Sequence, residues 1–284
     1  MIRSRAYAVP LVAVLLALAT GVALGAGPLT DTRSSAAPGP VVTSPGPQHQ
    51  YADSFAGAVA GRLYDNGLSR RPVAVVTTPG ADPATMAALT AQIKAAGGQV
   101  TATYALSSQL VDPEQKSLVD TLGSELGKQL HARIDKSAST YPRIGELLAV
   151  AVATRGAGVG RLDDDVSAVR QSMVAAKLMS VPQGPPDTAP LVLVVLGGEM
   201  DQAITDGLLT GLAARSRGVV AVGDAQAPNL LGLRQDGVTR HVTAVDGAET
   251  TAGQVASVLA LIRSWRTRGG SFGASGTNGA APLG

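Results

Sequence analysis

Apolar and polar positions alternate along the chain in a way that predicts strands and helices in turn. A short apolar run at 73–77 is closed by Pro and Gly, a pattern typical of a buried strand. In the next segment, 82–98, Asp82 is placed as a helix cap, Pro83 stands at the first helical position, and two glycines close the helix. A second apolar run at 99–106 completes a strand–helix–strand unit. Its crossover predicts that the two strands are parallel.

The rest of the chain continues this pattern around a helical stretch. Leucines at every fourth position predict a long helix that reaches about residue 134, namely Leu118, Leu122, Leu126 and Leu130. The other predicted elements are helices at 51–67, 143–154, 162–179, 200–215 and 251–265 and strands at 190–198, 218–224 and 239–245. The sequence therefore predicts an α/β fold, a Rossmann-like layered domain with a helical insertion around 112–180.

The N-terminal segment is long enough and apolar enough to cross a bilayer. Arg3 and Arg5 precede a nearly uninterrupted apolar run at 8–24. A cleavable signal peptide has an apolar core of about 7–15 residues, whereas a spanning helix needs about 17–25. Small residues at 23–25 also permit cleavage, which stays open as an alternative. We expect residues 1–29 to form an uncleaved signal anchor, a single transmembrane helix with a cytoplasmic N-terminus.

Composition divides the remaining chain into three parts. Residues 30–50 are rich in Pro, Ser, Gly and Thr and are predicted to be a linker. Residues 51–266 carry the predicted elements and are expected to form one extracytoplasmic α/β domain. Residues 267–284 are rich in Gly and Ser and are predicted to be a flexible tail.

The charge and the rare residue types exclude several classes of function. The net charge is only +2 and the basic residues are scattered along the sequence, so no nucleic-acid partner is expected. The chain has no cysteine, which excludes thiolate metal sites and cysteine nucleophiles. Aromatic residues make up 3% of the chain, so the core is built from Ala, Val and Leu.

The turns that follow the predicted strands are the places where a sheet of this kind binds a ligand. Three turns qualify, at 77–82, 196–201 and 222–227. Gly197 and Gly198 would let the backbone approach an anion at the start of the next helix, but we favour the simpler interpretation that a tight turn requires them. The glycine-rich segment 155–161 looks like a dinucleotide-binding motif, yet it follows a helix and lacks the spacing, so we predict a loop between helices.

Catalytic and metal-binding patterns are missing from the sequence. Three consecutive acids, Asp163–Asp165, open a predicted helix, where the helix dipole explains them. Glu199 and Asp224 would be catalytic candidates only because they lie on strand-end turns. The histidines and internal methionines are far apart and form no ligand motif: His49 (in the linker), His131, His241, Met86, Met173, Met179 and Met200. We therefore expect no enzyme, no catalytic residue and no cofactor. A metal site cannot be assigned, and weak contact with a copper ion would go through histidine or carboxylate.

Several segments together resemble the mycobacterial copper transport protein B (MctB) family of actinobacterial envelope proteins. The resemblance covers most of residues 1–265 in order and is carried by "IRSRAYAVPLVAVLLALATGVALGAGPLTD", "RPVAVVTTPGAD", "KAAGGQVTATYALSSQLVDPEQ", "LVLVVLGG", "VVAVGDAQA" and "AETTAGQVASVLAL". It implies an envelope protein with one membrane segment, an α/β domain outside the membrane and a role in copper resistance or efflux. It also implies a link to cell separation, through a coiled coil beside a partner membrane protein. Here the Pro-rich residues 30–50 replace the helix that usually follows the membrane segment, so any role of that helix would be reduced or would move to 51–67.

The resemblance and the anchor together give the expected function. We expect a membrane-anchored envelope protein that contributes to copper efflux or tolerance. One helix cannot enclose an ion path, so the protein would act as a homo-oligomer or as an accessory to another envelope protein. The alternative is a non-enzymatic extracytoplasmic interaction module in cell separation or cell-wall regulation.

Overall fold

A seven-stranded sheet, in the order β3-β2-β1-β4-β5-β6-β7, forms the centre of the fold. The computed structural model describes residues 46–130, 134–160, 163–180 and 187–283. Only the edge strand β3 is antiparallel to its neighbour, and all the other pairs are parallel. The strands are β1 (Val73–Thr77), β2 (Val100–Leu106), β3 (Met179–Ser180), β4 (Leu191–Val195), β5 (Gly218–Gly223), β6 (Thr243–Asp246) and β7 (Gly270–Phe272).

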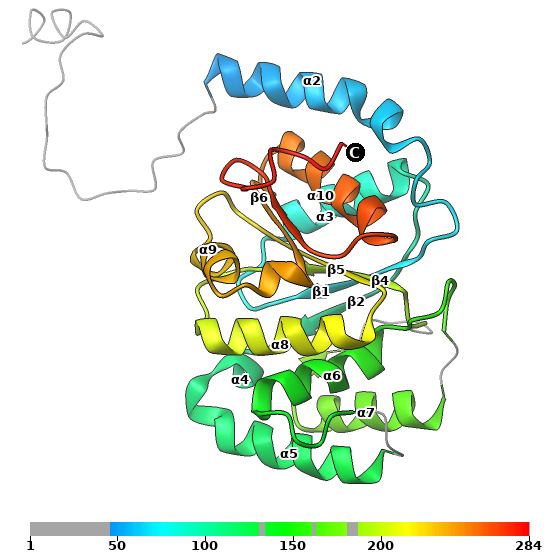
Figure 1. Ribbon diagram of the computed structural model, residues 1–284, viewed down its shortest axis with the longest axis vertical. Helices are drawn as coiled ribbons and strands as arrows, with labels where there is room; N and C mark the ends of the chain where they lie inside the picture. The colour runs from blue at the N-terminus through cyan, green and yellow to red at the C-terminus, as the bar shows by residue number, and fades with distance from the viewer. Residues whose placement is uncertain (1–45, 131–133, 161–162, 181–186, 284) are drawn as a thin grey trace, which may run out of the picture. The chain divides into compact units, whose positions relative to one another are not determined.

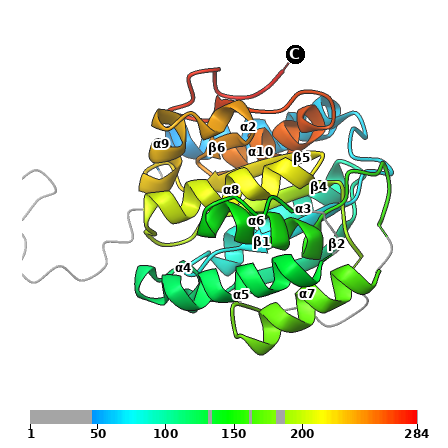
Figure 2. The same cartoon turned by 60° about the horizontal axis from the view of Figure 1, so that its bottom comes forward.

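Helices cover both faces of the sheet (Figures 1 and 2). One face carries α2 (Pro47–Tyr64), α3 (Pro83–Ala95) and α10 (Thr251–Ser264). The other face carries α4 (Ser108–Val111), α5 (Lys116–Gln129), α6 (Thr140–Val152), α7 (Asp164–Ala175), α8 (Gln202–Arg215), α9 (Pro228–Gln235) and the 3₁₀ helices η2 (Pro113–Gln115) and η3 (Val238–Arg240). The α/β class is therefore confirmed, and the chain between β2 and β4 is largely helical, as predicted.

The central strands β1, β4 and β5 consist almost entirely of apolar residues and glycine because both of their faces are buried. In β1, Ala74 and Val76 point into the core on the α8 side, while Val73 and Val75 point into the core on the α10 side. Every residue of β1, β4, β5 and β6 is buried. This explains why β1, β4 and β5 appear in the sequence as continuous apolar runs and not as alternating patterns, whereas β6 also buries Thr243 and Asp246.

Helices α6 and α8 cross at glycines. A methyl group added at Gly145 of α6 would lie 3.0 Å from the Cα of Gly211 in α8 and would overlap the carbonyl oxygen of Leu208. A methyl group added at Gly211 would lie 2.8 Å from the Cα of Gly145 and would overlap the carbonyl oxygen of Pro142. The two backbones are therefore in direct contact, and any side chain at either position would force the helices to shift.

The strand–helix–strand prediction is confirmed, with β1, α3 and β2 at the expected places. The linker prediction is wrong at its end, because α2 begins at Pro47 and not at residue 51. Pro47 takes the first helical position, which its fixed backbone angle favours. His49 consequently lies on a helix. The rest of the predicted linker and the expected anchor, residues 1–45, lie outside the residues that the structure describes.

The prediction of a flexible tail at 267–284 is wrong, because this segment adds β7 to the sheet beside β6. Beyond β7 the chain folds back: the amide of Ser271 donates to the side chain of Asn278 at 2.8 Å, and the amide of Asn278 donates to the carbonyl of Ser271 at 2.8 Å. The buried carboxylate of Asp246 accepts hydrogen bonds from the Ser275 amide and the Arg234 guanidinium, both at 3.1 Å. These bonds fix a segment whose composition suggests disorder.

Two smaller predictions also need correction. The leucine helix α5 ends at Gln129, and its buried positions include Val119 and Leu126, whereas Leu118 is 48% exposed. The strand expected at 239–245 begins only at Thr243, because η3 occupies the residues before it. A spacing of four residues thus identified the helix but placed its buried face wrongly at the first turn.

None of the helices described between residues 46 and 283 combines the length and the apolar character needed to cross a bilayer.

Candidate functional site

The three predicted turns meet at the carboxyl edge of the sheet. Strands β1 and β4 are neighbours in the sheet. The chain passes from β1 to β2 on one side and from β4 to β5 on the other side, so the connections leave β1 and β4 in opposite directions. In parallel sheets such a point opens a crevice. Here it holds a cavity of about 170 Å³, whose lining includes Gly80, Asp82, Gly197, Gly198, Gly223 and Asp224.

The glycines at this crevice serve contacts between the loops. The amide of Gly197 donates to the hydroxyl of Thr78 at 2.8 Å, and the amide of Gly198 donates to the carbonyl of Pro79 at 3.0 Å. A methyl group added at Gly80 would lie 2.7 Å from the nitrogen of Gly198. Because both amides are already used inside the protein, the tight-turn interpretation fits better than anion binding.

Carboxylates cap two of the helices that follow the turns at this edge, α3 and α8. Asp82 accepts hydrogen bonds from the amides of Ala84 and Thr85 at the start of α3, at 3.3 and 2.8 Å. The bonds from Thr85 are the main cause that lowers the pKa of Asp82. Asp201 accepts a bond from the amide of Ile204 at the start of α8, at 3.1 Å. These positions already carry negative charge, and the cavity is smaller than the roughly 300–1,000 Å³ of typical ligand pockets.

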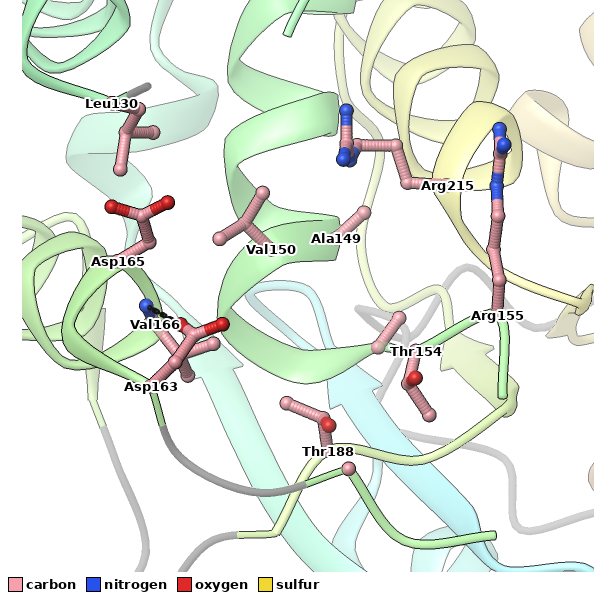
Figure 3. A pocket seen from close by; sticks show the side chains of 12 residues that line it. Leu130, Ala149, Val150, Thr154, Arg155, Asp163, Asp165, Val166, Thr188 and Arg215 are labelled. Carbon is pink, nitrogen blue, oxygen red and sulfur yellow. Dashed lines mark hydrogen bonds between the residues drawn. The ribbon is translucent and has the colours of Figure 1, made fainter. Parts of the chain in front are cut away.

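A larger cavity, of about 330 Å³, lies on the helical side of the sheet among α6, the start of α7 and the end of α8 (Figure 3). Its apolar lining comes mainly from α6 and its polar lining includes Thr154 and Thr188. This volume lies within the range of small-molecule sites.

Opposite charges line the two sides of this larger cavity. Figure 3 shows Asp163 and Asp165, from the start of α7, facing a side that carries Arg155 and Arg215. Asp163 also caps α7 by accepting a bond from the amide of Val166 at 2.8 Å. Arg215 lies 3.8 Å from Glu146, and Arg155 donates to the carbonyl of Ala214.

This arrangement could not be predicted from the sequence. The aspartates were explained by the helix dipole, and the cap made by Asp163 agrees with that explanation. Arg155 stood in the glycine-rich segment, which indeed connects α6 with α7, and Arg215 stood in the last turn of a helix. Only the packing of α6 against α8 brings the two arginines to face Asp163 and Asp165.

The candidate metal ligands do not come together in the described part of the chain. His49 on α2 and His241 after η3 are both exposed, and His131 lies outside the described residues. No group of three or more histidine, aspartate and glutamate side chains among the described residues is placed to hold a metal ion.

The remaining candidates are also dispersed. Met173 and Met179 are buried in the core, and Met86 and Met200 are partly exposed. Glu199 and Asp224 are exposed at the carboxyl edge, and of these two Asp224 lines the crevice.

Comparison with known proteins places the whole chain in one family. The family model described as "Copper transport outer membrane protein, MctB" matches residues 1–283. Relatives named "Copper transporter MctB" from Mycobacterium tuberculosis and Mycobacterium bovis are each 27% identical over 295 aligned residues, covering 92% of this chain and 92% of the relative. Because the family match runs along nearly the entire sequence, this chain belongs to the family of copper transport outer membrane proteins typified by MctB.

Proposed function

We propose that this protein acts at the cell membrane in copper efflux or copper tolerance, as an oligomer or as an accessory to another envelope protein. The observation that carries the proposal is the family match over residues 1–283, together with relatives named copper transporters that align along 92% of their length. The matched residues include both the expected membrane segment, 1–29, and the α/β domain. Membership associates this chain with copper transport, and the details of that role are our proposal.

The need for further chains follows from the physics of the bilayer. Residues 8–24 provide a single apolar run. A polar ion path inside a membrane must be enclosed on all sides, because unpaired polar groups are very costly in hydrocarbon. One helix cannot enclose such a path. A transport role would therefore require the segment 8–24 to lie beside membrane segments of other copies of this chain or of a partner.

The chemistry of the described domain favours an accessory role over a copper-storage role. Copper(I) prefers thiolate and thioether sulfur, and copper(II) prefers imidazole. The larger cavity is lined by apolar side chains together with carboxylate, guanidinium and hydroxyl groups, and none of its twelve lining residues carries sulfur or imidazole. We therefore propose that copper passes through the assembly, and that the α/β domain holds or regulates that assembly.

Cell-associated copper, measured by elemental mass spectrometry, tests this proposal. A deletion strain under mild copper load should accumulate more copper than its parent, and the wild-type chain should restore the parental level. A chain whose residues 1–29 are replaced by a cleavable signal peptide should fail to restore it. A matched chain carries an unrelated membrane anchor in place of residues 1–29. If this chain restores the copper level, the segment only tethers the domain to the membrane; if it does not, the segment has a specific role. Unchanged copper in the deletion strain contradicts the proposal.

A second candidate is a non-enzymatic interaction module in cell separation or cell-wall regulation. It is favoured by the carboxyl edge of the sheet, where Gly80, Gly197 and Gly198 bring two loops together at the position that α/β enzymes use for substrates. This function predicts a septation defect at normal copper levels in the deletion strain. A deletion strain with normal septation and raised copper excludes it.

A further inference from the structure

Arginines that are scattered in the sequence gather in space at the edge where the parallel strands begin. Arg70 and Arg71 precede β1, and Arg217 precedes β5. Arg263 stands in the last turn of α10, and Arg266 and Arg268 precede β7. Because parallel strands start at a common edge of the sheet, the short segments that precede these strands all lie along that edge. We call this surface the arginine edge; it comprises Arg70, Arg71, Arg217, Arg263, Arg266, Arg268 and Trp265.

Trp265 lies at the centre of the arginine edge. The guanidinium carbon of Arg217 is 4.0 Å from the centroid of the Trp265 ring, and that of Arg71 is 5.0 Å from it. Both distances fit cation–π interactions. The Nε of Arg217 also donates to the carbonyl of Trp265 at 3.1 Å. The tryptophan and two arginines thus form one connected unit.

Four of the six guanidinium groups of this edge, those of Arg71, Arg217, Arg263 and Arg268, donate hydrogen bonds to backbone carbonyls. Arg71 donates to the carbonyl of Gly67 at 2.6 Å, Arg263 donates to that of Gly269 at 2.6 Å, and Arg268 donates to that of Ser216 at 2.7 Å. The ion pairs that the structure gives between described residues involve other basic groups: Lys128, Arg143, Arg215 and Arg234. A carbonyl orients a guanidinium group but does not neutralise it.

Like charges therefore stand close together at this edge. Burial lowers the pKa of Arg71, and the neighbouring charges of Arg266 and Arg217 lower it further. An anion placed among these arginines would relieve the repulsion and would meet donors whose orientation is already fixed. Fixed donors lose less conformational entropy on binding.

We propose that the arginine edge binds an acidic segment of a partner protein, a stretch rich in aspartate and glutamate. Arginine forks match carboxylates in pairs of parallel hydrogen bonds. Arginine and tryptophan are also the residues that most often dominate binding energy at protein interfaces. The set that surrounds Trp265 contains arginine and no lysine, which favours this geometry over a diffuse field of charge. The inference is independent of the role in copper transport.

The single tryptophan of the chain provides the readout. The purified full-length protein in detergent is titrated with a synthetic peptide rich in Glu and Asp that lacks aromatic residues. We expect a saturable change in Trp265 fluorescence that weakens as salt is added. Calorimetry then gives the dissociation constant for each variant independently of the fluorophore.

Matched variants test whether the arginines themselves bind the peptide. Arg217→Gln with Arg266→Gln should weaken binding about a hundredfold, because each lost charged hydrogen bond weakens binding by about tenfold or more. Lys116→Gln with Lys128→Gln on α5 makes the same change in net charge away from this edge and should leave binding within about twofold, because exposed charges interact weakly through water. Arg266→Gln alone, at an exposed position, avoids disturbing the bonds that Arg217 makes.

Three results would overturn the proposal. The first is the absence of saturable peptide binding at low salt. The second is equal weakening by the lysine pair and the arginine pair, which would indicate general electrostatic attraction. The third is arginine-dependent binding of polyphosphate or of anionic lipid vesicles without binding of the acidic peptide, which would assign the edge to a phosphate-bearing partner.

Discussion

Replacing Gly145 by alanine tests whether the contact between α6 and α8 is as close as the structure has it. The added methyl group would lie 3.0 Å from the Cα of Gly211 and would overlap the carbonyl oxygen of Leu208. Both obstacles are backbone atoms, which cannot turn aside as a flexible side chain does. The two helices must therefore move apart, and the packing around them must change with them.

Two opposing effects set the magnitude. Alanine favours the helix over glycine by about 1 kcal/mol. Forcing an extra carbon into a packed core costs about 1–3 kcal/mol, and overlap with backbone points to the upper end. We therefore expect Gly145→Ala to lower the free energy of unfolding by about 2 kcal/mol. The matched control is Gly61→Ala in α2, where an added methyl group meets no atom within 4 Å. There only the helix preference acts, and stability should rise by up to about 1 kcal/mol.

Urea and thermal unfolding of the full chain in detergent measure both variants. About 1 kcal/mol shifts the melting temperature of a domain of this size by about 2–4 °C, so Gly145→Ala should lower it by about 4–8 °C. Gly211→Ala should behave in the same way. The double variant should cost less than the sum by about 1 kcal/mol, because the first methyl group has already separated the helices. A rise in stability for Gly145→Ala, or full additivity with Gly211→Ala, would refute the close contact.

Three other perturbations test different parts of the domain. Asp246→Ala leaves the buried Arg234 without its carboxylate and should cost about 3–5 kcal/mol; hydrogen exchange should then show lost protection in residues 270–278. Asp206→Asn should stabilise the protein more at neutral pH than at about pH 4, because burial is the main cause that raises the pKa of Asp206, to about 6. Thr250→Ala removes the hydroxyl that accepts a bond from the Gly253 amide at the start of α10 and should cost about 1 kcal/mol in urea unfolding.

For each of these three variants, one outcome would contradict the expected result. If Asp246→Leu combined with Arg234→Met is no milder than Asp246→Ala, the cost does not come from the stranded charge. For Asp206, the folded protein binds the proton more tightly than the unfolded chain does. The wild type should therefore lose stability as the pH rises from about 4 to about 6, and a flat profile would contradict the assignment. Thr250→Ser keeps the hydroxyl, so equal losses for Ser and Ala would show that the cap does not matter.

The parts of the fold that local chemistry determines were predictable from the sequence. Asp82 caps α3, Pro83 begins it, and Gly97, with its backbone angle φ of +77°, ends it, so the first strand–helix–strand unit could be placed to within a few residues. The meeting of the strand-end turns also followed, because parallel strands share a carboxyl edge. That the amides of Gly197 and Gly198 are used in loop contacts did not follow, since their acceptors come from the turn after β1.

The features that were missed depend on residues far apart in the chain. The arginines of the arginine edge looked scattered because only the sheet order brings the starts of β1, β5 and β7 together. The C-terminal segment looked flexible because glycine and serine dominate it, whereas the carboxylate of Asp246 and the pairing of β7 with β6 hold it in place. The composition of a segment indicates how that segment behaves by itself. It does not indicate the contacts that the segment makes with residues elsewhere in the chain.

The short outer strands of the sheet have a consequence for association between molecules. The outermost strands, β3 (Met179–Ser180) and β7 (Gly270–Phe272), are two and three residues long. A sheet edge recruits a strand from another molecule through a row of unpaired main-chain groups, and longer rows recruit more strongly. Rows this short give an incoming strand too few hydrogen bonds to offset the entropy of ordering it. These two strands are thus poor templates for an incoming strand. β3 pairs only with Ala105 and Leu106 of β2, so Val100–Tyr104 of β2 has no outer strand partner among the described residues, and this stretch is where the sheet offers main-chain groups to another molecule.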